Sequence, residues 1–389
     1  MIVRRLIVVV AALLLAIQIV RNGAVSALAT LSPQSAAKLW AEHPSVEISL
    51  GLADIGRSTR ERRSIGPQAF AMMDDAASKS PLSPEPFLVR GVEAQVSGDL
   101  ETAKRSFAAA QWRDPRSLPA AYFLATYYYR TGRAFEGLEQ TALLARLTPG
   151  GNVAVPFVAA YARDRSNWPQ MRRLFQSHRD LEGGVLATLA GDSVNADAVL
   201  ALADPEFRRP DSEWLPILLS SLVGSGDYSR ARAIWSSIGG GSSTDLLFDP
   251  NFSDAQPPPP FNWSLVSSSV GLAERQPRRG LHVIFYASED GVLASQLVLL
   301  PAGSYRLQLQ LGGSTVHPEE LRWSIRCNKQ DEPIASIAID EAARKGWTFQ
   351  VPADCPAQWI ELSGRSGDIA QQSEAVITGL KLAGPGTNG

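Results

Sequence analysis

The chain has 389 residues, of which 45% are hydrophobic and 20% are charged, with 37 basic and 39 acidic side chains for a net charge of −2. This charge balance excludes a strongly basic nucleic-acid binder, and the apolar content excludes a mostly disordered chain. Two cysteines and four scattered histidines leave little material for a zinc cluster, and the length predicts two or three domains at roughly 150 residues each.

Residues 1–30 have the composition of an export signal. Arg4 and Arg5 precede an apolar run over residues 6–20, which as a helix spans roughly 22 Å, less than the ~30 Å hydrocarbon core of a bilayer. One interpretation is a signal peptide cleaved after the A-x-A sequence at 27–29. The other is an uncleaved anchor with its N-terminus in the cytoplasm. We expect a single-pass protein of a bacterial inner membrane with its bulk in the periplasm, and a soluble periplasmic protein is the alternative.

A period of 34 residues follows this segment. Pro81, Pro115 and Pro149 are 34 residues apart, and so are Gly98 and Gly132, each of which opens a similar phrase. The pattern resembles the tetratricopeptide repeat (TPR) family, whose 34-residue unit is a helix–turn–helix. The resemblance implies an α-solenoid of stacked units, because one helix pair cannot bury its own apolar face.

The units follow the period unequally. In residues 84–117, which match best, Ala103, Phe107 and Ala110 form the inward stripe of the second helix, and Gly91 takes the small position where the two helices cross. Weaker copies are expected at 50–83, 118–151, 152–185 and 212–245, whereas the phase drifts over 184–211, where two short helices remain plausible. The predicted α-solenoid covers residues 31–238.

The first helices of such a stack line a concave face, which in the best unit carries Leu88 and Val92. Tyrosine and arginine are the residue types enriched at binding hot spots, so this face is the candidate site for a protein or peptide partner. Tyr128 is expected to point into the core and Tyr129 into the groove; the alternative is that these tyrosines only fill the gap between superhelix turns. The predicted partner-binding residues are Gln95, Tyr122, Thr126, Tyr129, Arg130 and Arg163.

The composition changes at residues 239–245, where three glycines and two serines predict a flexible linker. Residues 246–385 then carry short apolar segments of period two, such as 305–311, which indicate strands with one buried and one wet face. About seven to nine such strands predict an antiparallel β-sandwich or jelly roll. A tail is expected at 386–389.

The order of phrases in this segment is more specific. An Asn/Phe phrase at 247–252 is followed by a strand containing Gln296, a Pro-Ala-Gly turn at 301–303 and a Tyr-Arg strand from Tyr305. The order resembles galactose-binding-like jelly rolls used as carbohydrate-binding modules, which implies a glycan as a second candidate ligand. Many such modules hold a structural calcium, for which the candidate oxygen ligands are Asp249, Asn251 and Asp254. That spacing is a weak indication, and we expect no metal and no cofactor.

Cys327 and Cys355 are the only cysteines. In an exported chain a single pair predicts a disulfide, which here closes a 28-residue loop and stabilises the fold by roughly 3–4 kcal/mol on the entropy model. Two buried free thiols are the alternative. Without a C-x-x-C sequence, a redox-catalytic role is disfavoured.

The sandwich segment contains four tryptophans. An exposed indole can stack on a sugar, whereas a buried one only fills the core. Alternate side chains of a strand face the same side of the sheet. Trp323 alternates with Leu321 and Ile325 on one side, which favours the core, whereas Trp359 lies on the side opposite its apolar neighbour Ile360, which favours exposure. The predicted glycan-binding residues are Trp263, Trp347 and Trp359.

No established catalytic pattern is present in the sequence. Ser35 and Lys38 have the S-x-x-K spacing of penicillin-interacting enzymes, but the partner sequences are missing. We therefore expect an α + β multidomain protein that is not an enzyme: an N-terminal membrane or signal helix, a TPR-like α-solenoid and a C-terminal β-sandwich. The first hypothesis is a scaffold for a protein partner in envelope or exported-polysaccharide assembly. The alternative is a glycan-binding protein that uses the repeats as a spacer or docking arm.

Overall fold

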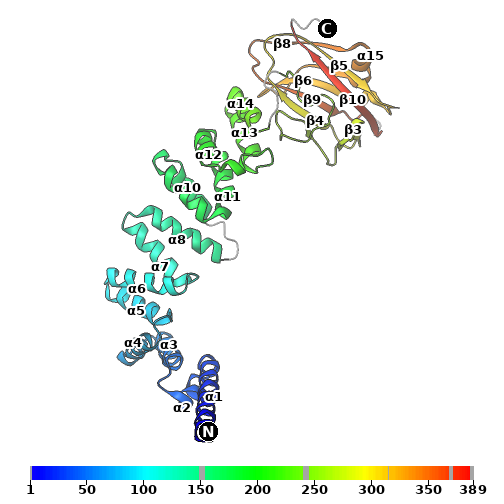
Figure 1. Cartoon of the computed structure of the whole chain (residues 1–389). Helices are drawn as coiled ribbons and strands as arrows, with labels where there is room; N and C mark the ends of the chain where they lie inside the picture. Colours follow the sequence, from blue (N-terminus) through cyan, green and yellow to red (C-terminus); the bar gives the residue numbers. More distant parts are fainter. Residues whose placement is uncertain (1, 149–153, 240–244, 314, 368–370, 386–389) are drawn as a thin grey trace. The chain divides into compact units, whose positions relative to one another are not determined.

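The computed structural model describes residues 2–148, 154–239, 245–313, 315–367 and 371–385 (Figure 1). Pro149, most of the predicted linker and the predicted tail lie outside the described residues. The chain divides into two compact units, Met1–Phe157 and Val158–Gly389. The first is helical, and the second combines helices with two β-sheets.

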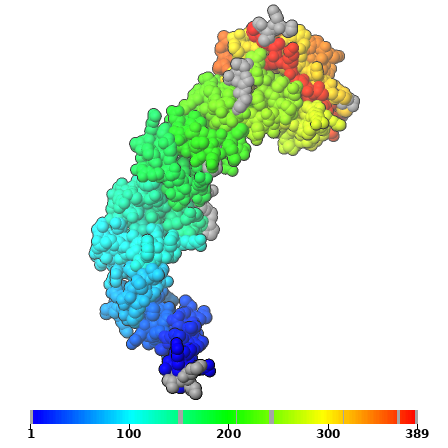
Figure 2. Space-filling model, in the orientation of Figure 1, coloured from blue at the N-terminus to red at the C-terminus, as the bar shows by residue number. Residues whose placement is uncertain are grey.

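Helices of the first unit follow one another with short connections. They are α1 (Ile2–Leu31), α2 (Pro33–Trp40), α3 (Pro44–Arg60), α4 (Pro67–Lys79), α5 (Glu85–Ser97), α6 (Leu100–Arg113), α7 (Leu118–Arg130) and α8 (Ala134–Leu147), and α9 (Val155–Ala162) crosses into the second unit. Consecutive helices pack as the pairs α3–α4, α5–α6 and α7–α8. In the space-filling view the colours of this unit succeed one another in chain order, as in a stack where each pair touches its neighbours (Figure 2).

Glycine sets the turns within the pairs α5–α6 and α7–α8. Gly98 ends α5 with φ 83° and Gly132 follows α7 with φ 75°, the left-handed conformation that glycine adopts without a Cβ penalty. Asp99 then begins α6, because its carboxylate accepts a hydrogen bond from the backbone N–H of Thr102 at 3.0 Å. The two glycines repeat at 34 residues, which confirms the TPR-like hairpins that the period predicts.

Alanine and phenylalanine fill the core of the best hairpin. Ala103, Phe107 and Ala110 are buried, as the stripe predicts. A Cβ on Gly91 would lie 2.9 Å from Cδ2 of Phe107, so the helices can cross this closely only at a glycine. The Phe107 ring stacks on Phe123 of α7 with centroids 4.2 Å apart, which joins one hairpin to the next.

The second unit begins with shorter helices. They are α10 (Trp168–Ser177), α11 (Arg179–Ala190), α12 (Ala196–Leu202), α13 (Trp214–Ser225) and α14 (Tyr228–Gly239), with 3-10 turns at Arg165–Asn167, Ser193–Asn195 and Pro205–Phe207. The end of α11 and the whole of α12 together occupy half of the segment 184–211, in which the period drifts. Gly226, with φ 91°, forms the turn between α13 and α14 in the same way as the glycines of the first unit.

Ten strands among the described residues form the sandwich. They are β1 (Ser264–Leu265), β2 (Gly271–Gln276), β3 (Gly280–Phe285), β4 (Gly291–Val298), β5 (Gly303–Leu311), β6 (Leu321–Cys327), β7 (Pro333–Ala338), β8 (Trp347–Val351), β9 (Gln358–Gly364) and β10 (Ser373–Ala383), with helix α15 (Ile339–Lys345) between β7 and β8. The sequence predicts seven to nine. The difference includes the two-residue strand β1, which is too short to show a period.

The strands form two antiparallel sheets, with the orders β1-β4-β9-β6-β7 and β2-β3-β10-β5-β8. The eight strands from β3 to β10 have the alternation between sheets expected of a jelly roll. Alternate side chains of β5 and β6 are buried between the sheets, including Tyr305, Leu307 and Trp323. The predicted fold class, a TPR-like helical region followed by an antiparallel β-sandwich, is therefore confirmed.

Helix α14 packs directly on the sandwich region. Trp235 of α14 is fully buried, and its Nε1 donates to the carbonyl oxygen of Pro258 at 2.7 Å. Its ring lies against Phe248 and Phe261, at centroid distances of 4.9 and 5.8 Å. Arg232 covers the same rings, and burial lowers the pKa of its guanidinium. The last hairpin and the sandwich thus share an apolar interface.

Candidate functional site

A groove runs over the first unit, lined by residues that include side chains of α3, α5 and α7. It consists of two adjoining cavities, of about 640 and 570 Å³, which share Val92, Phe107 and Pro119 in their walls. Because α3, α5 and α7 are the first helices of their pairs, this is the face that the repeat pattern predicts to be concave. The residues around both cavities are called the groove below.

The larger cavity is apolar. Ile55 of α3, Ile65 and Phe70 contribute side chains from the first pair, and Leu88, Val89 and Val96 contribute from α5. Val96 is 84% exposed, so much of this apolar surface faces solvent. Arg63 lies at the edge, where its guanidinium pairs with Glu61 at 2.8 Å and Asp54 at 3.2 Å. An apolar surface of this kind indicates a binding site for hydrophobic side chains.

The smaller cavity is mixed in character. Gln95, Tyr122, Thr126 and Arg130 line it together with Val92. The hydroxyl of Thr126 is already used within α7, because its Oγ1 donates a hydrogen bond to the carbonyl oxygen of Tyr122 at 3.0 Å. Tyr122 is 70% exposed. In the described part of the chain no hydrogen bond or ion pair engages the Arg130 guanidinium, so this cation can pair with an anionic group of a ligand.

Four of the six predicted partner-binding residues therefore surround one cavity, and two do not. Tyr129 remains 43% exposed, but its ring lies against Gly137 of its own hairpin and its hydroxyl is 3.0 Å from Oγ1 of Thr141. Arg163 lies in the turn after α9, in the second unit, and is exposed. Neither residue is among those that line the two cavities, and the partner-binding role of both stays a prediction. The binding role of the other four stays a prediction.

The sandwich tryptophans differ from the expectation of an open stacking platform. Trp263 is buried, and its Nε1 donates to the carbonyl oxygen of Asp249 at 3.1 Å. Trp347 is buried beside Phe349, with ring centroids 4.8 Å apart. A buried indole presents no face to a sugar, so the proposed glycan contact of these two residues is corrected: both fill the core of the sandwich.

Trp359 is half-buried on the outer side of β9. Its Nε1 donates to Oδ1 of Asn328 at 2.9 Å, and Nδ2 of Asn328 donates to the hydroxyl of Tyr228 in α14 at 3.0 Å. Trp359 thus faces outward from its sheet, as predicted, and lies at the junction of the sandwich with α14. A glycan contact at this residue stays a prediction.

The predicted disulfide is present. Cys327, at the end of β6, and Cys355, in the loop before β9, are bonded, with a Cα–Cα distance of 5.5 Å. Both are buried within the sandwich core. The bond ties together the loops at one end of the sandwich, on the same side as Asn328.

Asp249, one of the three candidate calcium ligands, is engaged in hydrogen bonds within its own loop. The Asp249 carboxylate accepts hydrogen bonds from Ser253 (N and Oγ) and from the Asp254 backbone, and it lies 3.6 Å from Nε of Arg275. Its oxygens are thereby used to shape the loop. The described residues contain no group of three or more histidine, cysteine, aspartate or glutamate side chains placed to hold a metal ion.

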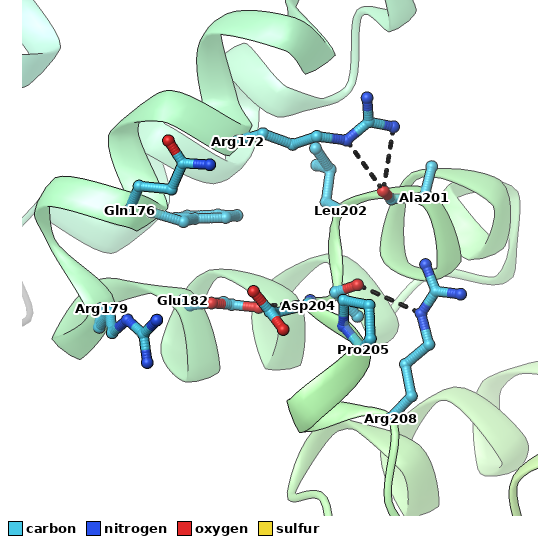
Figure 3. A pocket seen from close by; sticks show the side chains of 11 residues that line it. Arg172, Gln176, Arg179, Glu182, Ala201, Leu202, Asp204, Pro205 and Arg208 are labelled. Carbon is cyan, nitrogen blue, oxygen red and sulfur yellow. Dashed lines mark hydrogen bonds between the residues drawn. The ribbon is translucent and has the colours of Figure 1, made fainter.

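A further cavity, of about 320 Å³, lies between α10, α11 and α12 (Figure 3). Arg172 donates to the carbonyl oxygen of Ala201, and Arg208 donates to those of Leu200 and Ala203. Buried Glu182 accepts from the Asp204 backbone at 2.8 Å, and burial raises the pKa of its carboxyl. The arginines thus satisfy the carbonyls at the end of α12, which is the capping that this short helix requires.

Comparisons with known proteins add two weak likenesses. No protein-family model and no curated protein matches the sequence. Among solved structures, TmCBM61 in complex with beta-1,4-galactotriose is similar over 36% of this chain and 98% of its own, with 17% identity and a TM-score of 0.23. Yeast Tom70, a TPR-containing protein, is similar over 52% of this chain and 44% of its own, with 16% identity and a TM-score of 0.24. The chain thus spans less than half the length of Tom70.

The repeat pattern misses the apolar half of the groove. The unit at 50–83 matches the family only in its second helix, so the pattern assigns Ile55 and Ile65 no place on the concave face. Leu52 and Ile55, three residues apart in α3, would have indicated an apolar helix face. Both are at least partly exposed in the structure.

Proposed function

We propose that the chain is an exported, non-catalytic scaffold whose groove on α3, α5 and α7 binds a hydrophobic segment of a protein partner. The observation that carries the proposal is the continuity of the two cavities across three successive first helices. A groove assembled from several helices fits an extended or helical peptide, whose side chains enter successive cavities. The burial of Trp263 and Trp347 supports placing the binding site on the helices and not on the sandwich.

The chemistry of the groove indicates the ligand. Aliphatic and aromatic side chains of the partner would cover Ile65, Phe70 and Val96 in the apolar cavity. A carboxylate of the partner would pair with Arg130 at the other end, where Tyr122 adds an aromatic surface. The proposed ligand is therefore a hydrophobic segment that carries an acidic group at one end.

The location of the protein is part of the same proposal. Disulfides persist in oxidising compartments, and the Cys327–Cys355 bond is consistent with export of the sandwich. An apolar helix of sufficient length lies near the N-terminus. We place the bulk of the chain in the periplasm of a bacterium, at the inner membrane. A role in the assembly of envelope or exported polysaccharide rests on domain analogy alone.

Photocrosslinking in living cells tests the groove. The full chain is produced with p-benzoylphenylalanine in place of Tyr122, and covalent adducts are identified by mass spectrometry. Trp112 of α6, which is 72% exposed and does not line the groove, is the matched control position. We expect one dominant protein adduct at position 122 that is missing at position 112.

A second substitution tests whether the adduct depends on the groove. Val92→Glu places a charge in the wall that both cavities share, so it should reduce the adduct at position 122 at least tenfold. Lys104→Glu, at a half-buried position of α6 that lines neither cavity, should not change the yield. Adducts of equal yield at positions 112 and 122, or an adduct indifferent to Val92→Glu, would remove the basis of the proposal.

A further inference from the structure

Helix α1 has two parts that differ in burial. From Arg4 to Gly23 every side chain is exposed, including Val20 at 70%. Two residues later burial begins, and Val25 has no exposed surface. The helix continues without a break to Leu31. One continuous helix therefore emerges from the folded part of the unit with an apolar, uncovered N-terminal half.

The C-terminal part of α1 belongs to the folded unit. Val25 and Ala29 form an apolar cluster with Ala36 of α2 and Val46 of α3. Polar contacts surround the point where the helix leaves the cluster. The Arg21 guanidinium lies 4.4 Å from the centroid of the Trp40 ring and donates to the carbonyl oxygen of Leu39, and Asn22 pairs with His43 across a 2.8 Å hydrogen bond.

The uncovered part has the dimensions of a membrane span. The fifteen residues of the apolar run, 6–20, extend over roughly 22 Å as a helix, and the long side chains of the arginines that flank it can reach the two interfaces of a bilayer whose hydrocarbon core is about 30 Å thick. Arg4 and Arg5 lie at one end, and Arg21 with Trp40 lies at the other. Basic side chains at both ends of an apolar helix, with a tryptophan at one of them, fit the two membrane interfaces.

We infer that α1 is a retained anchor whose last turns are a structural part of the first helical pairs, so that the Ala27-Leu28-Ala29 sequence is not processed. Cleavage after Ala29 would remove two buried members of the cluster and expose Ala36 and Val46. It would also remove the partners of Trp40 and His43. Proteolysis requires an exposed, locally unfolded segment, whereas these three residues lie inside a helix and Ala29 is buried. The inference rests on the export proposed above.

The first test determines where the mature protein begins when cells produce it. The full chain with a C-terminal tag is produced in a bacterium with its own signal peptidase, and the membranes are washed with alkaline carbonate. We expect the tagged protein in the carbonate-resistant pellet, with an intact mass that includes residues 1–29. A mature chain that begins at Thr30 in the soluble fraction would overturn the inference, and the groove proposal would still stand.

The second test requires no variant. In the wild-type protein in detergent, hydrogen exchange should protect the amides of residues 25–30 to the same degree as those of α3. Free exchange of residues 25–30 beside a protected α3 would contradict the packing on which the inference rests.

A substitution in α2 then tests whether the packing of α1 protects the Ala27-Leu28-Ala29 sequence from cleavage. Ala36→Glu introduces a charge under Val25 and Ala29, so elastase should cut within residues 24–31 at least ten times faster than in the wild type. Lys38→Glu, exposed on the same helix, should leave the rate unchanged. Equal cleavage rates in the wild type and in Ala36→Glu would count against the inference.

Discussion

Single small residues decide where the aromatic rings of the repeats lie. In α5–α6 the small residue is Gly91 on the first helix, and Phe107 of the second helix packs on it. In α7–α8 the relation is reversed: Gly137 lies on the second helix, and Tyr129 of the first helix packs on it. The position that corresponds to Phe107 is Thr141, which is too small to fill the space. The Tyr129 ring therefore packs partly against its own hairpin, with 43% of the residue left exposed.

Substitution of Gly91 tests this packing. Gly91→Ala would place a Cβ 2.9 Å from the Phe107 ring and should destabilise the α5–α6 pair by about 1–3 kcal/mol through overpacking. Hydrogen exchange of the α5 and α6 amides measures the change. Gly183→Ala is the matched control, because Gly183 also lies within a helix but has no atom within 4 Å of the added Cβ. It should stabilise α11 slightly by helix propensity. Equal effects at both positions would refute the packing argument.

The same residues show how far the sequence alone can lead. The period of 34 predicts the hairpins, their turn glycines and the side chains of the inner stripe, because these depend on local spacing. The direction of Tyr129 depends on the volume of Thr141 on another helix, which the period does not contain. The burial of Trp263 and Trp347 likewise depends on how two sheets face each other. The alternation of side chains along β9 predicts that Trp359 faces outward, but only the fold shows that it contacts Asn328, which in turn contacts α14.

At the scale of helices, His43 holds α3 to α1. Its Nδ1 accepts from the backbone N–H of Ser45 at 3.3 Å and thereby caps α3, so its Nε2–H donates to Asn22 of α1. A protonated imidazole would carry a hydrogen on Nδ1 and could not accept that bond. Burial lowers the pKa of His43 below its usual 6.5, which agrees with a neutral ring in the folded state.

A pH dependence follows for this contact. Because the folded state binds the His43 proton less readily than the unfolded chain, its stabilising contribution is complete above about pH 6.5 and declines as the pH falls below that value. Hydrogen exchange in residues 24–31 and at the start of α3, corrected for the intrinsic rate, should therefore be faster at pH 5.5 than at pH 7.5. In His43→Asn, where asparagine caps but does not titrate, the corrected rates should not depend on pH. A wild type without pH dependence would exclude His43 as the titrating group.

At the scale of the molecule, the last hairpin and the sandwich form one structural unit. The Trp235 ring fills the space between α14 and the loops around Phe248 and Phe261, and Tyr228 reaches Asn328. The glycine and serine composition at 239–245 predicts a flexible connection, but the contacts on either side of that segment hold the two parts together. A cut at this segment would leave an apolar surface exposed on both fragments.

Truncation of the Trp235 side chain tests the unit. Trp235→Ala should destabilise it by about 3–5 kcal/mol, because a fully buried indole is lost. Hydrogen exchange should then increase together in α14 and in the loops around Phe248 and Phe261. Trp112→Ala, at an exposed indole, should change stability by less than about 0.5 kcal/mol. Faster exchange confined to α14 would mean that the sandwich does not depend on the helix.

The unbroken course of α1 has a mechanical consequence. Membrane spans adjust their tilt to the thickness of the bilayer. Residues 2–31 form one helix whose end packs on α2 and α3, so with α1 as the membrane anchor inferred above, a change of its tilt would also tilt α3. Helix α3 is also the first wall of the groove. A thinner or thicker bilayer would therefore reorient the groove relative to the membrane plane without altering any residue that lines it.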